Sequence, residues 1–336
     1  MTTPAASDGP ADAFAALSDS NRVAILEALW EADGHEASFS DLRSAVGMRD
    51  SGQFNYHLGK LTDQFVRQTD DGTYALSVAG IHVVGSIIGG TYTGETTVEA
   101  RPADESCPWC GTAAVFAYED EQFSIECPEC DLAMAEMPAP AGVFEPYSPA
   151  DAPAVGRAYT RNVIHDLFDG FCPFCRGPVE VTVTTYDPAE DPPVDSDTDT
   201  RTDDAGSDSD HPPSDEEHTS TANEDDDATE PSGPPTGAEL RETPKAEYEC
   251  ERCGESIHTS LGALSEHPAA VAFYYDHGRN VADLPLGERA AVTPETAWIE
   301  ERDPLRAVVR FTADDEALEL TVDDNLDVRD TTRTQL

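Results

Sequence analysis

Eight cysteines in four Cys-x-x-Cys pairs are the residues of this chain whose spacing can bind metal ions. The pairs are Cys107/Cys110, Cys127/Cys130, Cys172/Cys175 and Cys250/Cys253. The first two pairs flank residues 113–118 and 122–125, which we predict to form a β-hairpin. This pattern is typical of a zinc ribbon, where four thiolates surround Zn²⁺ and leave no position open for a substrate. A structural zinc site is therefore expected, with redox dithiols as the alternative.

The last two pairs are separated by 74 residues, which include a long acidic run. We interpret them as a second ribbon whose hairpin tip is greatly lengthened, because a longer loop adds only a modest closure cost. Pairing of cysteines across the two ribbons is the alternative. The expected cofactor is thus Zn²⁺ at two structural sites.

A second set of chemically useful residues lies in the stretch 50–65. Its apolar residues recur with helical spacing and are Phe54, Leu58, Leu61 and Phe65. Asp50 and Gln53 have the spacing of a capping box, so a helix should begin near Asp50 or Ser51. Gln53, Tyr56 and Lys60 face away from the apolar stripe and carry groups that contact base edges or phosphates. The alternative is a surface helix with ordinary polar residues.

The elements around this helix predict how it is presented. Three helices are expected before it. The first covers residues 12–17, the second begins at the capping residues in Ser18–Arg22 and ends near Trp30, and the third covers 41–46 with Ser40 as its N-cap. Residues 66–69 and 73–77 flank an Asp-Gly turn and should form a hairpin. This order is that of a helix-turn-helix followed by a wing, with 50–65 in the recognition position. The candidate DNA-contacting residues are Arg49, Ser51, Gln53, Asn55, Tyr56, Lys60 and Arg67.

The segments AFAALSDSNRVAILEAL, FSDLRSAVG, QFNYHLGKL and GTYALSVAG resemble the winged helix-turn-helix of ArsR-type regulators of bacteria and archaea. The resemblance covers residues 11–90 and implies a winged helix, binding to double-stranded DNA and a homodimer. Metal-sensing members carry Cys-x-Cys in the third helix. This chain has Ser40–Val46 there, without cysteine, so metal sensing at that helix is not expected. His82 matches another metal position of the family, although a lone histidine on an apolar helix is more often a packed residue.

The Val78–Gly90 stretch is apolar on most sides and contains three glycines before its last residue. We expect it to be a buried helix. It is predicted to form the homodimer contact, and packing against the next domain of the same chain is the alternative.

The charge of the chain is −48, and only two of its 20 basic residues are lysines, Lys60 and Lys245. Without the run Asp187–Thr243, 48 acidic residues still face 18 basic ones. Such an excess repels itself at low salt and is screened at molar salt. The composition is typical of a salt-in halophile such as a haloarchaeon. The alternative, an ordinary acidic protein with one acidic tail, conflicts with the scarcity of lysine throughout.

The sequence begins without a basic, apolar leader, and its most apolar run is too short and too glycine-rich to span a bilayer. We expect a cytoplasmic protein without membrane contact, in which the cysteines are reduced. An enzyme is not expected, because no nucleophile–base set, phosphate-binding glycine loop or open metal site is visible.

The predicted fold class is α+β with five segments. These are a winged helix at 11–92, zinc ribbon 1 at 100–140, a helix with the first half of ribbon 2 at 150–186, an insertion at 187–243, and the second half of ribbon 2 with a C-terminal unit at 244–330. The insertion lacks aromatic residues and is expected to be disordered. The tail is expected to contain a helix near His267, a hairpin at 307–312 and 317–322, and a third strand at 325–329.

The whole layout resembles haloarchaeal ArsR-type regulators. The leading functional hypothesis is a DNA-binding transcription regulator whose ribbons serve as an effector or interaction module. One alternative is a basal factor similar to the alpha subunit of archaeal TFE, which also joins a winged helix to a zinc ribbon and acts with the transcription machinery. Another is a protein-interaction scaffold without DNA binding. Within residues 20–75, nine acidic residues outnumber five basic ones, which argues against a broad basic patch.

Overall fold

The computed structural model describes residues 9–130, 132–185 and 243–336. The chain has α+β structure and divides into two compact units. The N-terminal unit comprises the described residues up to Thr97 together with Ala139–Tyr147, and the C-terminal unit comprises Val98–Pro138 and the described residues from Ser148 onward. Nearly all of the predicted acidic insertion lies outside the described residues. None of the described helices is long and apolar enough to span a membrane.

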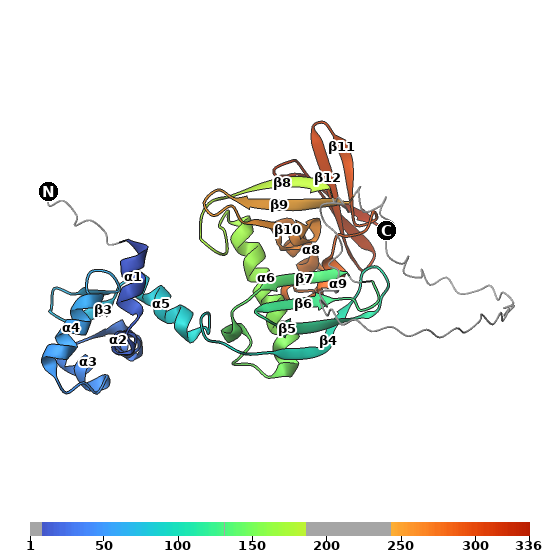
Figure 1. The fold of residues 1–336 in the computed structure, drawn as a ribbon. Helices are drawn as coiled ribbons and strands as arrows, with labels where there is room; N and C mark the ends of the chain where they lie inside the picture. The colour runs from blue at the N-terminus through green and yellow to red at the C-terminus, as the bar shows by residue number, and fades with distance from the viewer. Residues whose placement is uncertain (1–8, 131, 186–242) are drawn as a thin grey trace, which may run out of the picture. The chain divides into compact units, whose positions relative to one another are not determined.

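The N-terminal unit has the arrangement of a winged helix (Figure 1). Its elements are α1 (Pro10–Leu17), α2 (Ser20–Glu31), η1 (Asp33–His35), β1 (Glu36–Ala37), α3 (Phe39–Ala45), α4 (Ser51–Leu61), β2 (Val66–Gln68), β3 (Tyr74–Leu76) and α5 (Val78–Ile88), with η2 (Ala141–Val143) in the returning segment. The strands form an antiparallel sheet in the order β1-β3-β2. The predicted wing hairpin is confirmed.

The α4 helix begins where its capping residue predicts. The Asp50 carboxylate accepts the backbone N–H groups of Gly52 and Gln53 at 2.7 and 3.0 Å. The apolar stripe is buried, with Phe54, Leu58 and Leu61 at most 1% exposed. The predicted extension to Phe65 is wrong, because the chain leaves the helix at Thr62 and Asp63 has a φ of 75°. Phe65 still reaches the core through the turn that follows.

The α3 helix begins earlier than predicted. Ser38, rather than Ser40, is the N-cap, and its hydroxyl accepts the N–H of Asp41 at 3.2 Å. Phe39 therefore lies in the first turn, where its ring packs edge-on against Phe54 with centroids 4.8 Å apart. Packing of the partly buried Phe39 ring against Phe54 selects one of two serines that are equally suitable as caps.

The prediction that α5 is buried is wrong for this chain by itself. Only Gly80 and Val84 of α5 are buried, whereas Val78, Ile81 and Ile88 are 71, 39 and 57% exposed. The small size of Gly80 is required, since a Cβ there would lie 2.2 Å from the Phe65 carbonyl oxygen. One side of α5 packs on the core, and the other leaves large apolar side chains on the surface.

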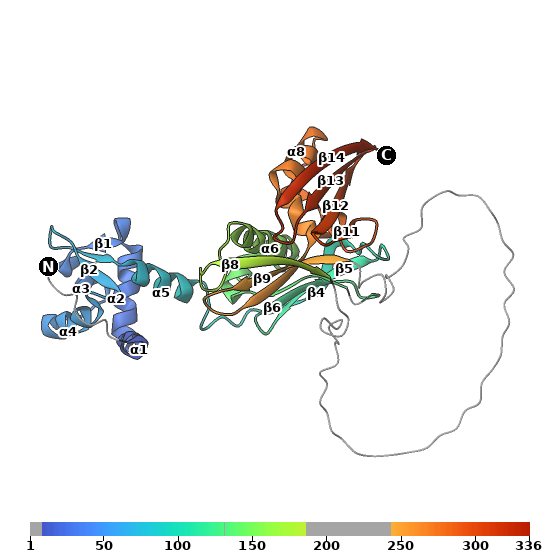
Figure 2. The ribbon, with the colours of Figure 1, turned by 90° about the horizontal axis from the view of Figure 1, so that it is seen from above.

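The C-terminal unit contains three antiparallel sheets (Figures 1 and 2). The strands are β4 (Val98–Ser106), β5 (Ala113–Glu119), β6 (Gln122–Glu126), β7 (Ala133–Pro138), β8 (Val179–Thr185), β9 (Pro244–Cys250), β10 (Ser256–Ser260), β11 (Ala297–Arg302), β12 (Leu305–Ala313), β13 (Glu316–Val322) and β14 (Val328–Gln335). The sheet orders are β4-β5-β6-β7, β10-β9-β8 and β11-β12-β13-β14. The helical elements are η3 (Pro149–Asp151), α6 (Ala152–Phe168), η4 (Leu261–Glu266), α8 (Pro268–Asp276), η5 (Val281–Asp283) and α9 (Leu286–Arg289).

The α6 helix contacts both the first sheet and the larger core of this unit. Gly156 lies under the first sheet so closely that a Cβ there would be 2.9 Å from the Phe116 ring. Near its end, Leu167 belongs to the core that also holds Tyr248 and Phe311. Both ribbons thus pack against the same helix, α6.

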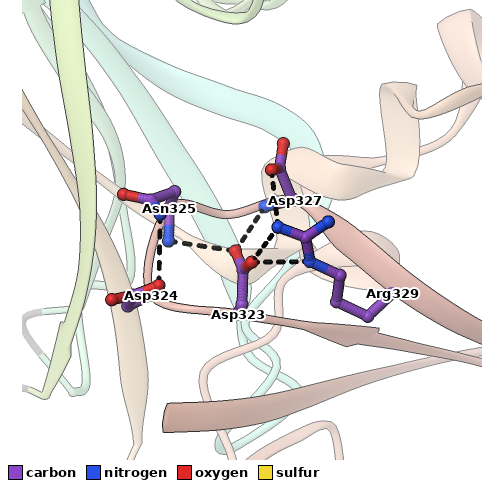
Figure 3. A network of polar contacts seen from close by, with 5 residues as sticks. All are labelled: Asp323, Asp324, Asn325, Asp327 and Arg329. Carbon is purple, nitrogen blue, oxygen red and sulfur yellow. Dashed lines mark hydrogen bonds and ion pairs between the residues drawn. The ribbon is translucent and has the colours of Figure 1, made fainter. Parts of the chain in front are cut away.

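The C-terminal tail matches its predicted helix and hairpin, which correspond to α8, β12 and β13. The third strand, β14, begins at Val328, because residues 323–327 form a turn rather than a strand. In that turn the Asp323 carboxylate accepts the N–H groups of Asn325 and Asp327, both at 3.0 Å, and pairs with Arg329 (Figure 3). The strands β4, β7 and β11 were not predicted.

Substitution of Leu58 by alanine tests the buried stripe of α4. The change leaves a cavity beside Phe54 and Leu61 and should lower the free energy of unfolding by about 2–5 kcal/mol. Denaturation followed by circular dichroism gives this value. The control, Tyr56→Ala, alters the same helix at a side chain that is 59% exposed, and it should stay within about 0.5 kcal/mol of the wild type. Equal losses for both variants would contradict the buried stripe.

Candidate metal centres and the α4 surface

The eight cysteines form two groups of four, in the pairing that the sequence predicts. Cys107, Cys110, Cys127 and Cys130 make one group, and Cys172, Cys175, Cys250 and Cys253 make the other. Within each group all ligand atoms lie within 4.8 Å of one another, and no cysteine is in a disulfide. Strands β8 and β9 bring the second group together, with Val179 opposite Cys250. The alternative of pairing across the ribbons is wrong.

All four Cys-x-x-Cys turns have the same backbone geometry. The N–H of the first cysteine donates to the carbonyl oxygen five residues later, over 2.8–3.0 Å. These bonds join Cys107 to Thr112, Cys127 to Leu132, Cys172 to Gly177 and Cys250 to Glu255. In three of the turns the residue directly after the second cysteine has a positive φ. These residues are Gly111, Arg176 and Gly254. The repeated turn directs both sulfurs of each pair toward the same point.

The sulfur distances fit a tetrahedral metal site. The Sγ atoms of Cys110 and Cys127 are 3.5 Å apart, and those of Cys175 and Cys250 are 3.4 Å apart. Four sulfurs at about 2.3 Å from a tetrahedral ion would lie about 3.8 Å from one another. Cys172 and Cys253 are separated by 3.8 Å. Two groups of four thiols can therefore each hold one metal ion.

The surroundings of the thiols explain why a cation suits these groups. Hydrogen bonding from the Thr112 side chain lowers the pKa of Cys110 to about 6, whereas burial raises the pKa of Cys130. In the second group the backbone N–H of Cys253 lowers the pKa of Cys250 to about 6. Without a cation, neighbouring thiolates repel one another and some thiols stay protonated. Metal binding should therefore release protons and weaken in acid.

The tips of the two ribbons differ in what covers them. The indole N–H of Trp109, between the cysteines of the first pair, donates to the Val292 carbonyl oxygen at 3.2 Å. The corresponding residue of the third pair is Phe174, which is 55% exposed beside Phe171 at 51%. The first tip is thus held within its own unit, and the second presents two aromatic rings on the surface.

A buried group of charged residues lies next to the first ribbon. Glu105, 4% exposed and two residues before Cys107, lies 3.4 Å from an Arg157 guanidinium nitrogen. Burial raises the pKa of Glu105, against the opposing effects of the Gly287 N–H and of Arg157. Nearby, Arg289 donates to Glu266 at 2.7 Å. These buried ion pairs join β4, α6, η4 and α9.

The predicted DNA-contacting side chains lie on the surface of the N-terminal unit. Seven residues are exposed, namely Arg49, Ser51, Gln53, Asn55, Tyr56, Lys60 and Arg67. Six lie on α4 or immediately before it, and Arg67 lies on β2. The Lys60 ammonium is 5.9 Å from the centre of the Tyr56 ring. Five of the seven predicted side chains thus share α4, and Arg49 and Arg67 come from the segments next to it.

His57 is a buried polar side chain that was not among the predicted site residues. It is 6% exposed on α4, with its Nδ1 atom 3.6 Å from Asp19 Oδ1 at the start of α2. Helical spacing from Phe54 and Leu61 places position 57 toward the core, and this signal was available in the sequence. Histidine at position 82 is exposed on α5, and no metal-binding cluster among the described residues includes it.

The acidic turn at 323–327 is not among the described metal-binding clusters. The Arg329 guanidinium lies between the carboxylates of Asp323 and Asp327, with a contact of 2.9 Å to the latter (Figure 3). An arginine thus occupies the place where a cation would balance these charges.

Residues 104–208 and 216–328 match the family described as a domain of unknown function, DUF7351. The chain belongs to the DUF7351 family. Residues 10–87 match another family described as a domain of unknown function, DUF7347. The first match spans both cysteine groups, and the second spans the winged helix. No curated protein and no solved structure matches the chain.

Metal content tests the two cysteine groups. The purified chain should carry about two metal ions, and Cys172→Ser and Cys250→Ser should each remove one, because they belong to the same site. Elemental analysis with thiol titration gives the count. Cys107→Ser should remove the other ion, and Cys172→Ser/Cys250→Ser should lose no more than either single variant. A double variant that lost both ions would contradict the assignment.

The pH dependence of stability tests the burial of Glu105. A carboxyl whose pKa is raised in the folded state favours the protonated form, so it destabilises the fold as the pH rises above its usual value of 4.5. The stability of the wild type should therefore decrease relative to Glu105→Gln with rising pH. The control is Glu119→Gln, which makes the same exchange at an exposed glutamate of β5. Chemical denaturation at several pH values, with metal content checked, measures the free energy of unfolding of the wild type and of both variants. A difference between the wild type and Glu105→Gln that does not change with pH would refute the raised pKa of Glu105.

Proposed function

We propose that the DUF7351-family chain is a DNA-binding transcription regulator with an ArsR-like winged helix. The observation that supports this most is the division of α4 into two faces. Phe54, Leu58 and Leu61 anchor the helix in the core, while its polar side chains stand free on the other side. A helix held rigidly by its apolar face, with a hairpin beside it, suits insertion into the major groove.

The charges around α4 favour base contacts over phosphate contacts. Exposed Arg49, Lys60 and Arg67 supply cations, but the wing turn carries exposed Asp70 and Asp71. At molar salt the release of counterions contributes little to binding. Specificity would then depend on hydrogen bonds from residues such as Gln53 to base edges.

The homodimer predicted through α5 gains support from its exposed apolar side. Val78, Ile81 and Ile88 follow one another at spacings of three and seven residues. Burial of such residues between two copies would remove apolar surface from water. A two-fold dimer would place two α4 helices on the half-sites of a palindromic operator.

We further propose that both cysteine groups hold Zn²⁺ in structural sites. Four thiolates at tetrahedral spacing are the ligand set of structural zinc, and they leave no coordination position for catalysis. The exposed Phe171 and Phe174 at the second tip favour a role of this unit in contacting another protein, such as a component of the transcription machinery. In this proposal the chain is not an enzyme and acts in the cytoplasm.

DNA-binding measurements across a range of salt concentrations test the proposal. With an operator selected from random duplexes, Gln53→Ala should lose about 1–3 kcal/mol of discrimination against mutated operators. Lys60→Ala and Arg67→Ala should weaken binding to all duplexes similarly. Each should also reduce the slope of the logarithm of the binding constant against the logarithm of the salt concentration by about one.

Gln122→Ala, which removes an exposed glutamine from β6 of the other unit, is the matched control and should bind like the wild type. Circular dichroism verifies folding of every variant. If Gln53→Ala, Lys60→Ala and Arg67→Ala all bind the operator like the wild type, α4 does not read DNA, and the scaffold hypothesis gains most.

A further inference from the structure

The N-terminal unit has a hollow of about 450 Å³ beside α5. Its walls come from the end of α2, from α5 with the residues that follow it, and from the returning segment Ala139–Tyr147. Sites that bind small molecules usually have volumes of about 300–1,000 Å³. The hollow has this volume but is open to solvent on one side, since Ile81, His82 and Thr91 in its lining are exposed. It could hold a ligand of one or two rings that keeps one face in water.

Apolar side chains from all three walls line the hollow. Trp30 lies at the end of α2, Ile81 on α5 and Val143 in the returning segment. The Trp30 ring is stacked on His35, with centroids 4.6 Å apart and planes 20° apart. This stacking restrains the indole in a fixed orientation, which lowers the entropy lost when an aromatic ligand packs against it.

Three polar side chains complete the lining, and each can form hydrogen bonds. They belong to His82 and Ser86 on α5 and to Thr91 just after it. Within the described part of the chain, none of these three side chains makes a hydrogen bond to another protein group. They remain available to a polar group on the edge of a ligand.

The lining contains no Asp, Glu, Lys or Arg, although these four residue types make up 26% of the chain. A charged ligand would therefore find no opposite charge in the wall, and an anion would also meet a protein of charge −48. Taking a charged group out of water without a partner is unfavourable. The lining thus selects for an uncharged molecule.

The returning segment forms a well-defined wall. The Gly142 N–H donates to the Gly89 carbonyl oxygen at 3.0 Å, and a Cβ at position 142 would lie 2.3 Å from that oxygen. A Cβ on Gly94 would lie 2.2 Å from the Ala141 Cβ. These contacts between small residues bring the segment directly against the end of α5, so the hollow exists before any ligand enters.

We propose that this hollow binds a small, uncharged aromatic molecule that carries a hydrogen-bonding group. The ring would pack against Trp30, Ile81 and Val143, and its polar edge would face Ser86 and Thr91. The proposed function assigns no ligand to the chain, so this site goes beyond it. A ligand here would touch the helix proposed to form the dimer.

Calorimetric titration of the full chain with 1-naphthol in molar KCl tests the site. Gly85 lines the hollow, and a Cβ there meets nothing within 4 Å, so Gly85→Leu should fill the space without a clash. This variant should bind 1-naphthol at least about tenfold more weakly than the wild type, since the leucine side chain would occupy the ligand's place. The control Gly59→Leu makes the same change on α4, at a position that is equally open, and should keep wild-type affinity.

A second pair of variants tests the polar edge. Thr91→Val keeps the shape of the side chain and removes its hydroxyl, so it should weaken 1-naphthol binding by about two- to tenfold. Thr97→Val alters an exposed threonine that does not line the hollow and should change nothing. The anion 1-naphthalenesulfonate should bind at least about tenfold more weakly than 1-naphthol.

Light scattering on the same samples measures the molar mass of the protein and shows whether a second copy of the chain occupies the hollow instead. If 1-naphthol does not bind, or binds Gly85→Leu as it binds the wild type, the proposal is wrong. It is also wrong if 1-naphthol binding is lost at those protein concentrations at which the measured mass becomes that of a dimer. A second copy of the chain would then fill the hollow. These results do not depend on DNA binding. A dimer that fills the hollow would overturn the ligand site and support the homodimer proposed through α5, so the two proposals can fail separately.

Discussion

Bringing four thiols within 4.8 Å of one another is the constraint on which the C-terminal unit depends. Thiolates at this distance repel one another, so a cation bound between them would stabilise the arrangement. In the second group this requirement joins two chain segments that are far apart in the sequence. Strands β8 and β9 then pair from Val179 opposite Cys250 to Thr185 opposite Pro244. The geometry of this cysteine group and the strand register therefore support each other.

The α6 helix gives the two ribbons a common core. At Gly156 the absence of a side chain allows Phe116 and Phe123 to lie directly on the helix. The buried pairs Glu105–Arg157 and Glu266–Arg289 add directional contacts between β4, α6 and the segment that follows β10. Because breaking one partner of a buried ion pair leaves an uncompensated charge, such pairs select one arrangement of the packed elements.

In the N-terminal unit, the single helix α4 carries both a buried apolar face and the surface that we propose binds DNA. One side of α4 is anchored by buried apolar residues, while the other keeps polar groups in solvent. In a chain with so few basic residues, this geometry favours a reader that uses hydrogen bonds to bases. The adjoining helix α5 combines an exposed apolar side with a hollow free of charged residues. Dimerisation, ligand binding and DNA binding would then meet within one small unit, as proposed above.

The amino-acid sequence by itself determined the local elements and the candidate metal ligands. Cys-x-x-Cys spacing predicted the four cysteine turns, because the turn geometry depends on only six consecutive residues. The pairing of strands β8 and β9 decided that Cys172 and Cys175 group with Cys250 and Cys253. The period of Phe54, Leu58 and Leu61 predicted the buried face of α4, because helical geometry repeats locally. The tertiary structure decided what depends on distant neighbours: Ser38 rather than Ser40 as the cap of α3, the end of α4 before Phe65, and the exposure of Ile88. It also decided that Glu105 is buried, and that Trp109 is covered whereas Phe174 is exposed. Each of these follows from packing or desolvation by segments remote in the sequence, which no local pattern encodes.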